Sequence, residues 1–285
     1  MRFRLQPTPA QEAALLEHCA HARYVWNLAC EQHLHWRPGR ANAPRYAEQS
    51  RQLTEARKEC PWLAAGSQTV QQQALRDFAQ AMANFFAGIH RRPTWRKTGI
   101  HEGFRIVGQR GNHWNARQLS RKVGEVRIPK VGWVRFRWSR DIPAEAKSFW
   151  VERDRAGRWH VCFAMIPPPI DGPGTGAVVG VDRGVAVSAA LSTGELTSVP
   201  GLHETETERL GRLQRRLARA APRSNRRKRV KTAIARLKAR ETDRRKDWAE
   251  KTSTDLARRF DFIRLEDLRS APWFVPHAAR SLRRG

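Results

Sequence analysis

The sequence of 285 residues contains few cysteines, few tyrosines and few acidic residues. Its four cysteines never form a C-x-x-C pair, so the sequence contains no zinc-ribbon pattern. Cysteines scattered in this way are typical of reduced, structural thiols. The two tyrosines, Tyr24 and Tyr46, both lie in helical sequence, which argues against a strand-transferring enzyme that depends on a catalytic tyrosine.

Long apolar runs are also missing from the sequence. No segment approaches the roughly 18 apolar residues of a membrane span. The opening residues 1–11 have no apolar core of the kind that a signal peptide requires. The bias towards Arg, Ala and Trp is typical of a GC-rich bacterial genome. We therefore expect a cytoplasmic, nucleoid-associated bacterial protein without a membrane partner.

Positive charge dominates the composition, with 54 Lys and Arg against 27 Asp and Glu and a formal net charge of +27. Such a charge indicates a polyanionic partner, and nucleic acid is the usual one. A membrane surface is the other polyanion, but the sequence shows no amphipathic anchor. A basic tail like those of ribosomal proteins is a further alternative, but here the cations are spread through sequence that is patterned like folded domains.

The first part of the chain predicts a short strand followed by helices. Thr8 is a good N-cap with Pro9 at the first helical position, and the helical pattern continues to about residue 36. Further helices are predicted at 46–60 and 67–89. In the last of these, an apolar stripe is typical of core packing and consists of Val70, Leu75, Phe78, Met82, Phe85 and Phe86.

Downstream of these helices the pattern changes to short alternating segments with Gly and Pro between them. They predict strands at 103–109, 125–138 and 148–166, the last with a hairpin turn at 154–157. We predict that residues 1–170 form an α+β part, a small β-barrel with a helical insertion at about 9–90. The Pro- and Gly-rich residues 167–176 predict a linker and a domain boundary.

Residues 177–285 predict a second domain of the α/β class. Strands are predicted at 177–182, 185–191 and 195–199, then a helical region at 203–260, then a buried strand over FIRLE at 262–266. Pro222 and Ser224 interrupt the apolar periodicity of the helical region. We therefore expect two helices that form a hairpin.

The predicted hairpin is strongly basic. Residues 209–246 contain seventeen Lys and Arg but only two acids, Glu241 and Asp243. A charged helix face is normally only solvated, but like charges one turn apart repel each other, so this density requires phosphates nearby. The basic segment 90–97 has the same character around one Trp. The candidate nucleic-acid contacts are Arg92, Trp95, Arg96, Lys97, Arg215, Arg216, Arg226, Arg227, Lys228 and Arg229.

Two acids end apolar strands of the second domain, Asp182 in the first and Glu266 in the fourth. Taken alone, Asp182 is also explained as a turn residue of D-R-G, and Glu266 as an ion-pair partner of Arg264 or Arg269. In an RNase H-like sheet, however, the first and fourth strands are neighbours and the carboxylates converge. Paired carboxylates in a phosphate-binding context predict Mg²⁺, and two such ions support in-line hydrolysis of a phosphodiester.

Together these segments resemble the TnpB (OrfB) family of transposon-encoded proteins, which is related to the type V CRISPR effectors. The resemblance covers nearly the whole chain and is closest at VVGVDRGVAVSAALSTGE and over residues 210–268. It implies a wedge-like β-barrel with a helical lobe, followed by a RuvC-like nuclease domain with Asp182 and Glu266 as its first two catalytic acids. It also implies a guide RNA derived from the transposon end, and Mg²⁺-dependent cleavage of double-stranded DNA that pairs with this guide.

The chain departs from the family pattern near its end. The family continues past EDL with a four-cysteine zinc ribbon and a third catalytic Asp, whereas here no acid follows Asp267 and zinc is not expected. An incomplete carboxylate set binds Mg²⁺ weakly, because this ion needs near-ideal octahedral geometry. We therefore expect a C-terminally truncated copy with impaired cleavage. The alternative is a protein that binds guide RNA and DNA without cutting, such as a repressor.

Overall fold

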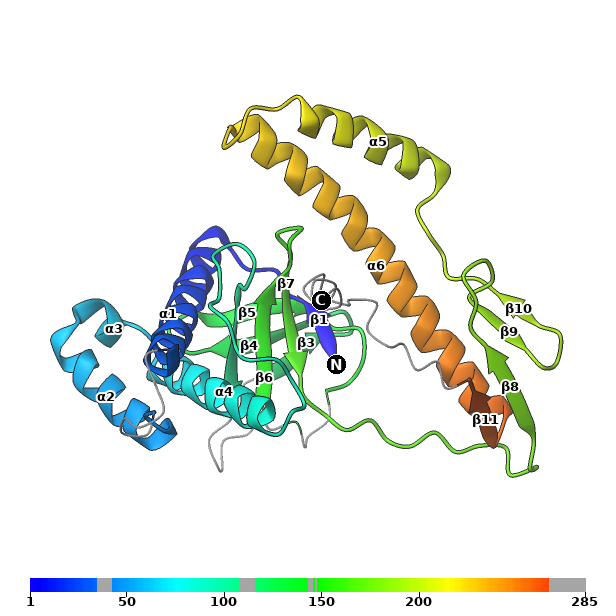
Figure 1. The fold of residues 1–285 in the computed structure, drawn as a ribbon, viewed down its shortest axis with the longest axis horizontal. Coiled ribbons are helices and arrows are strands. Elements are labelled where there is room, and N and C mark those ends of the chain that lie inside the picture. The colour runs from blue at the N-terminus through cyan, green and yellow to red at the C-terminus, as the bar shows by residue number, and fades with distance from the viewer. Residues whose placement is uncertain (35–42, 108–115, 143–145, 147, 267–285) are drawn as a thin grey trace, which may run out of the picture. The chain divides into compact units, whose positions relative to one another are not determined.

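The computed structural model describes residues 1–34, 43–107, 116–142, 146 and 148–266 (Figure 1). These residues form a mixed α+β fold with three small sheets. The chain divides into two compact units, Met1–Pro167 with Arg216–Arg236, and Pro168–Arg215 with Leu237–Gly285. Within the described ranges, no helix combines the length and the apolar character that crossing a membrane requires.

The first unit opens with β1 (Arg2–Arg4) and α1 (Pro9–Leu34), as the sequence predicts. A capping box starts α1. Thr8 Oγ1 accepts a hydrogen bond from the Gln11 backbone N–H at 3.3 Å, and Gln11 Oε1 accepts one from the Thr8 N–H at 3.0 Å. Pro9 has no N–H that would need a partner at this position. The predicted N-cap is therefore confirmed.

Three more helices follow, α2 (Tyr46–Glu59), α3 (Pro61–Ala65) and α4 (Gln68–Phe86). The sequence predicts α2 and α4 but not the short α3. Four residues of the predicted stripe in α4 are buried, namely Val70, Leu75, Phe78 and Met82. The prediction is wrong for Phe86, which is 76% exposed. All residues in the last turn of α4 are at least partly exposed, so this turn extends beyond the core.

Two antiparallel sheets complete the first unit, in the orders β1-β7-β6-β2 and β3-β4-β5. Their strands are β2 (Gly103–Val107), β3 (Ala116–Ser120), β4 (Val123–Ile128), β5 (Gly132–Arg137), β6 (Ser148–Arg153) and β7 (Trp159–Phe163). An aromatic cluster joins the two sheets. The ring of Phe3 lies 5.3 Å from that of Phe136 and 5.8 Å from that of Phe163. Burying such rings together stabilises the fold beyond the apolar area alone.

The predicted hairpin turn between β6 and β7 is confirmed. The Gly157 N–H donates to the Asp154 carbonyl at 2.9 Å, and Gly157 takes a φ of +79° that favours glycine. The Asp154 carboxylate also accepts from the backbone N–H groups of Ala156 and Arg158. By contrast, β3 was not predicted, because four of its five side chains are exposed and no apolar alternation marks it.

The second unit contains one sheet in the order β10-β9-β8-β11. Its strands are β8 (Val178–Asp182), β9 (Ala189–Leu191), β10 (Leu196–Thr197) and β11 (Phe262–Leu265). They correspond to the predicted strands, although β9 starts later because the chain first bends, with the Gly184 N–H bonded to the Val187 carbonyl. The prediction of a buried FIRLE strand is wrong. All four residues of β11 are exposed, because this strand lies at the edge of the described sheet and contributes no residue to the buried core of the unit.

The predicted pair of helices is also present, as α5 (Glu204–Ala218) and α6 (Asn225–Arg259). The break between them contains Pro222, and Arg223 takes a left-handed φ of +62° there. Four apolar residues of the two predicted stripes are buried, namely Leu210, Leu213, Val230 and Leu237.

Two histidines of α1, His18 and His21, are almost completely buried. His18 Nε2 lies 2.7 Å from the Pro129 carbonyl, and His21 Nε2 lies 3.1 Å from the Trp62 carbonyl. Each Nδ1 is buried and has no partner among the described residues. A carbonyl can only accept, so Nε2 of each ring carries a proton, and a second proton on Nδ1 would have no acceptor among the described residues. Burial lowers the pKa of both histidines.

We expect the first unit to lose stability as the pH falls below about 6.5, the ordinary histidine pKa. The unfolded chain then binds protons that the folded His18 and His21 do not, at a cost of up to about 1.4 kcal/mol per pH unit for each. Thermal melts between about pH 7.5 and about pH 5 measure this effect. His18→Gln and His21→Gln should flatten the pH dependence, whereas His90→Gln, at an exposed position, should not. Parallel curves for all variants would contradict the prediction.

Candidate carboxylate pair and nucleic-acid surface

The two predicted acids lie at the same end of neighbouring strands in the second unit. β8 and β11 are neighbouring parallel strands (Figure 1). Their register pairs Val181 with Leu265. The next residue on each strand is Asp182 at the end of β8 and Glu266 just after the end of β11. Paired residues of neighbouring strands point to the same face of a sheet. Both carboxylates therefore start level on one face, and both residues are exposed.

The simpler explanations of the two acids find no support among the described residues. Asp182 accepts no hydrogen bond from the backbone of the turn that follows it, so it is not a turn-capping residue within the described structure. Glu266 has no ion-pair partner there, and Arg264 in particular does not pair with it. The other predicted partner, Arg269, lies outside the described residues.

The donor chemistry of the pair fits Mg²⁺. Carboxylate oxygens are the hard ligands that this ion prefers, and the exposure of Asp182 and Glu266 leaves room for the waters that Mg²⁺ retains. Within the described ranges, no group of three or more His, Cys, Asp or Glu side chains is placed to hold a metal ion. Among the described residues, the two carboxylates thus stand without a third side chain of these types to complete a ligand set.

Hydrogen bonds hold the α5–α6 hairpin at its base and at its tip. At the base, Arg244 donates to the Glu206 carboxylate at 2.6 and 3.0 Å, and this contact lowers the pKa of Glu206 to about 2. At the tip, Arg227 Nη1 donates to the carbonyls of Leu217 at 2.8 Å and Ala220 at 3.2 Å. A cation at these carbonyls satisfies the C-terminal end of α5. Arg227, predicted as a phosphate contact, is thus already bonded to the protein.

The other predicted cations of the hairpin point to solvent. These cations are Arg215, Arg216, Arg226, Lys228 and Arg229. Each is exposed and has no ion-pair partner among the described residues. Exposed guanidinium and ammonium groups without a carboxylate nearby are available for phosphates.

The predicted basic segment 90–97 is fastened to α1. Trp26 Nε1 donates to the Thr94 carbonyl at 2.9 Å. The Asn27 side chain makes two hydrogen bonds with the Arg96 backbone, at 2.7 and 3.0 Å. The Arg96 guanidinium lies 3.7 Å from the centre of the Trp26 ring, and burial lowers the pKa of Arg96. This cation–π contact makes Arg96 part of the packing.

The remaining predicted residues of this segment stay accessible. Trp95 and Lys97 are exposed. Arg92 is exposed as well, and it donates one hydrogen bond to the His33 carbonyl at 2.8 Å, which leaves its other N–H groups for further partners.

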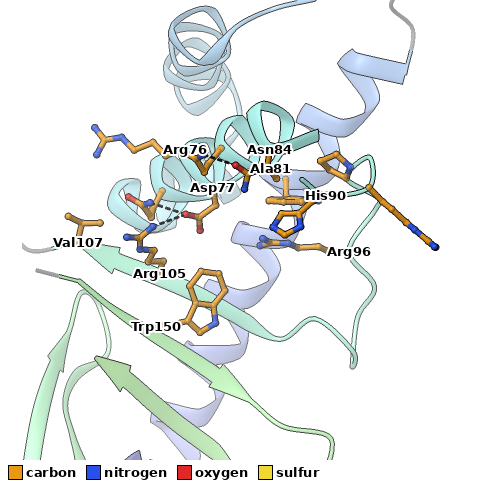
Figure 2. Close-up of a pocket in the computed structure, with 14 residues that line it drawn as sticks. Arg76, Asp77, Ala81, Asn84, His90, Arg96, Arg105, Val107 and Trp150 are labelled. Atoms are coloured by element: carbon orange, nitrogen blue, oxygen red, sulfur yellow. Dashed lines mark hydrogen bonds and ion pairs between the residues drawn. The ribbon is translucent and has the colours of Figure 1, made fainter. Parts of the chain in front are cut away.

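A cavity of about 610 Å³ lies in the first unit beside this segment (Figure 2). Its cationic lining consists of Arg76, Arg91, Arg96 and Arg105. The one acid in its lining is Asp77 of α4, which Figure 2 shows directed towards Arg105 of β2, with 3.3 Å between Oδ1 and Nη1. Trp150 of β6 adds an aromatic ring. Sequence reasoning missed Arg76, Arg105 and Trp150, because they come from separate elements and no local motif marks them.

Comparison with known families identifies the class of protein to which this fold and site belong. Residues 160–273 match OrfB_IS605, described as “Probable transposase”, and residues 1–37 match HTH_OrfB_IS605, described as “Helix-turn-helix domain”. The chain belongs to the OrfB (TnpB) family of transposon-encoded proteins, as its sequence predicts. Within residues 1–34, the described structure holds β1 and one continuous helix rather than two helices.

Two curated relatives cover most of this chain. A “Putative RNA-guided DNA endonuclease” of Streptomyces pristinaespiralis is 34% identical over 94% of this chain and 66% of its own length. The “Putative RNA-guided DNA endonuclease InsQ” of Escherichia coli (strain K12) is 28% identical over 94% of this chain and 65% of its own length. The chain thus spans slightly less than two thirds of the length of each relative. A solved CRISPR-Cas12f ternary complex matches over 90% of this chain and 63% of that chain, with a TM-score of 0.43 and 12% identity.

The two neighbouring arginines at the hairpin tip should behave differently when replaced. We expect Arg227→Ala to destabilise the hairpin by about 1–2 kcal/mol, because two carbonyls lose a charged donor. Arg226→Ala should leave stability within about 0.5 kcal/mol, because this side chain is exposed, but should weaken the binding of nucleic acid. Hydrogen exchange of the hairpin amides and a filter-binding assay measure the two effects. Equal protection in both variants would refute the capping role of Arg227.

Proposed function

We propose that this protein is an RNA-guided DNA endonuclease of its transposon, with a RuvC-like carboxylate site at Asp182 and Glu266. The observation that carries this proposal is the parallel pairing of β8 with β11, which brings the two acids level on one face. In this proposal residues 1–170 form a wedge-like barrel with the helical lobe at about 9–90, and residues 177–285 form the nuclease domain after the 167–176 linker.

Asp182 and Glu266 would hold Mg²⁺ through their carboxylate oxygens. When bound, the metal supplies a nucleophilic water and stabilises the oxygen that leaves the phosphodiester. The protein's own part is to fix the two carboxylates on adjacent strands and to bind the nucleic-acid backbone. Solvent-exposed cations of the hairpin support the second task, above all Arg226, Lys228 and Arg229.

The proposed partners are a guide RNA from the transposon end and a double-stranded DNA target. Base pairing with the guide would read the sequence, while the protein recognises backbone and shape. This division of labour is consistent with the exposed cations, because an arginine or lysine that contacts phosphate carries no sequence information. Arg92, Trp95 and Lys97, together with the cationic cavity, are the proposed contacts of the first unit.

A second candidate function is guided binding without cleavage. The observation that favours it is the small number of ligands, since the described residues bring together two carboxylates and no larger metal-binding group. A protein of this kind would occupy a matched site on DNA and block access to it. Cleavage of the bound target separates the two functions.

We expect the chain, purified with its bound RNA, to cut matched DNA in the presence of Mg²⁺, but slowly, because two carboxylates alone hold this ion weakly. Asp182→Ala and Glu266→Ala should each lower the cleavage rate by about a hundredfold or more, because each removes a ligand of the metal. Asp171→Ala, an exposed acid of the linker, is the matched control and should cut like the unaltered protein. If Asp182→Ala cuts as fast as the control, the nuclease assignment is wrong. RNA-dependent binding without any cleavage would favour the second function.

Binding of RNA should depend steeply on salt. The logarithm of the association constant should fall by about 0.7 per phosphate contact for each unit of the logarithm of salt concentration. Replacing Arg226, Lys228 and Arg229 with alanine should reduce this slope by about 2, since about three contacts are lost. A slope that the triple replacement leaves unchanged would exclude the hairpin tip as a phosphate site.

A further inference from the structure

The end of the predicted linker is bound to a single carboxylate at the start of β11. Asp261 Oδ1 accepts a hydrogen bond from the Gly174 N–H at 2.8 Å, and Oδ2 accepts from Gly176 at 2.7 Å and Ala177 at 3.2 Å. In return, the backbone N–H groups of Asp261 and Phe262 donate to the Ala177 carbonyl at 2.9 and 3.1 Å. We call this set of contacts the Asp261 clasp.

Three glycines shape the clasp. Gly174 and Gly176 take left-handed φ values of +69° and +73°. Backbone turned in this way lets successive N–H groups converge on one anion. At Gly172, a Cβ would lie only 2.6 Å from Asp261 Oδ1, so a larger residue would displace the carboxylate. The converging N–H groups, first that of Gly174, hold the pKa of Asp261 below its usual value.

The clasp and the carboxylate pair lie at opposite ends of the same two strands. Ala177 precedes β8 and Asp261 precedes β11, and five residues further along each strand come Asp182 and Glu266. At about 3.3 Å per residue, the clasp lies roughly 16 Å from the pair. A slip of one residue in the register would turn one carboxylate to the opposite face of the sheet.

Little else among the described residues fixes this register. β11 pairs with β8 over only four residue pairs and is an edge strand. The buried core of the second unit takes Val179 and Val181 from β8 but no residue from β11. Short, exposed strands specify their register weakly when no face is buried. The Asp261 clasp is thus the strongest described constraint on how β11 aligns with β8.

We propose that Asp261 is a positioning residue for the carboxylate pair, which sets the register of β11 on β8 so that Glu266 comes level with Asp182. This proposal rests on the proposed function of the pair as a site for a divalent metal. It assigns the Gly-rich end of the linker a role in the metal site rather than in interdomain flexibility alone.

The test measures Mn²⁺ affinity by titration calorimetry on the full chain. Asp261→Asn keeps the size of the side chain but removes the anion, and Gly172→Ala displaces the anion without removing it. Each should weaken Mn²⁺ binding by about tenfold, the scale found for residues that orient metal ligands. The matched controls Asp171→Asn and Gly201→Ala, where a Cβ meets nothing within 4 Å, should bind like the unaltered chain.

Asp182→Asn separates failure of this proposal from failure of the proposed function. Loss of Mn²⁺ binding in Asp182→Asn, with normal binding in Asp261→Asn and Gly172→Ala, would overturn the positioning role and leave the metal pair intact. Normal binding in Asp182→Asn would overturn both.

A disulfide engineered between paired positions of β8 and β11 reports their register directly. This measurement does not depend on a bound metal. Val178 and Phe262 are paired and exposed, so Val178→Cys with Phe262→Cys should oxidise readily to a disulfide that mass spectrometry detects. Adding Asp261→Asn should lower the yield of this disulfide strongly. An unchanged yield would show that the register does not depend on Asp261 and would overturn the proposal. This conclusion would hold even if Asp261→Asn lowered the thermal stability of the chain.

Discussion

The candidate site depends on one interaction, the parallel pairing of β8 with β11. Between these strands the chain completes the β9–β10 ribbon and the α5–α6 hairpin, so no local sequence relation connects the two acids. Parallel strands bring their carboxyl ends to the same edge of the sheet, and the register of Val181 with Leu265 places the next residues level. Without this pairing, Asp182 and Glu266 would be two separate surface acids.

Much of the site was predictable because a few strong local signals mark it. Each acid ends a short apolar run, and the order of strands and helices between them limits the topologies in which they meet. The helical hairpin was predictable from Pro222 and Ser224, which interrupt two leucine- and valine-containing stripes. The start of α1 was predictable because Thr8 and Pro9 together satisfy the first turn of a helix.

What the sequence did not predict depends on contacts between distant residues. Arg226 and Arg227 are adjacent and chemically identical, yet one faces solvent and the other caps α5, because only the latter lies over the carbonyls of Leu217 and Ala220. Arg96 similarly belongs to the packing on Trp26. The apolar residues of the FIRLE segment predict a buried strand. Burial, however, requires another element that covers the strand, and hydropathy does not show whether such an element is present. A Gly-rich segment likewise reads as a flexible linker until the acid that its N–H groups bind is known.

The uncompensated charge of the hairpin has a consequence for the thermodynamics of the whole chain. Like charges on neighbouring turns of α5 and α6 repel each other, so the isolated helices carry an electrostatic strain that salt screens and phosphates relieve. Any polyanion that binds the folded hairpin better than the unfolded one shifts the folding equilibrium by mass action. A nucleic acid that binds the folded hairpin would therefore also stabilise the folded chain. The stability of the hairpin should accordingly vary with ionic strength and with the concentration of free polyanion.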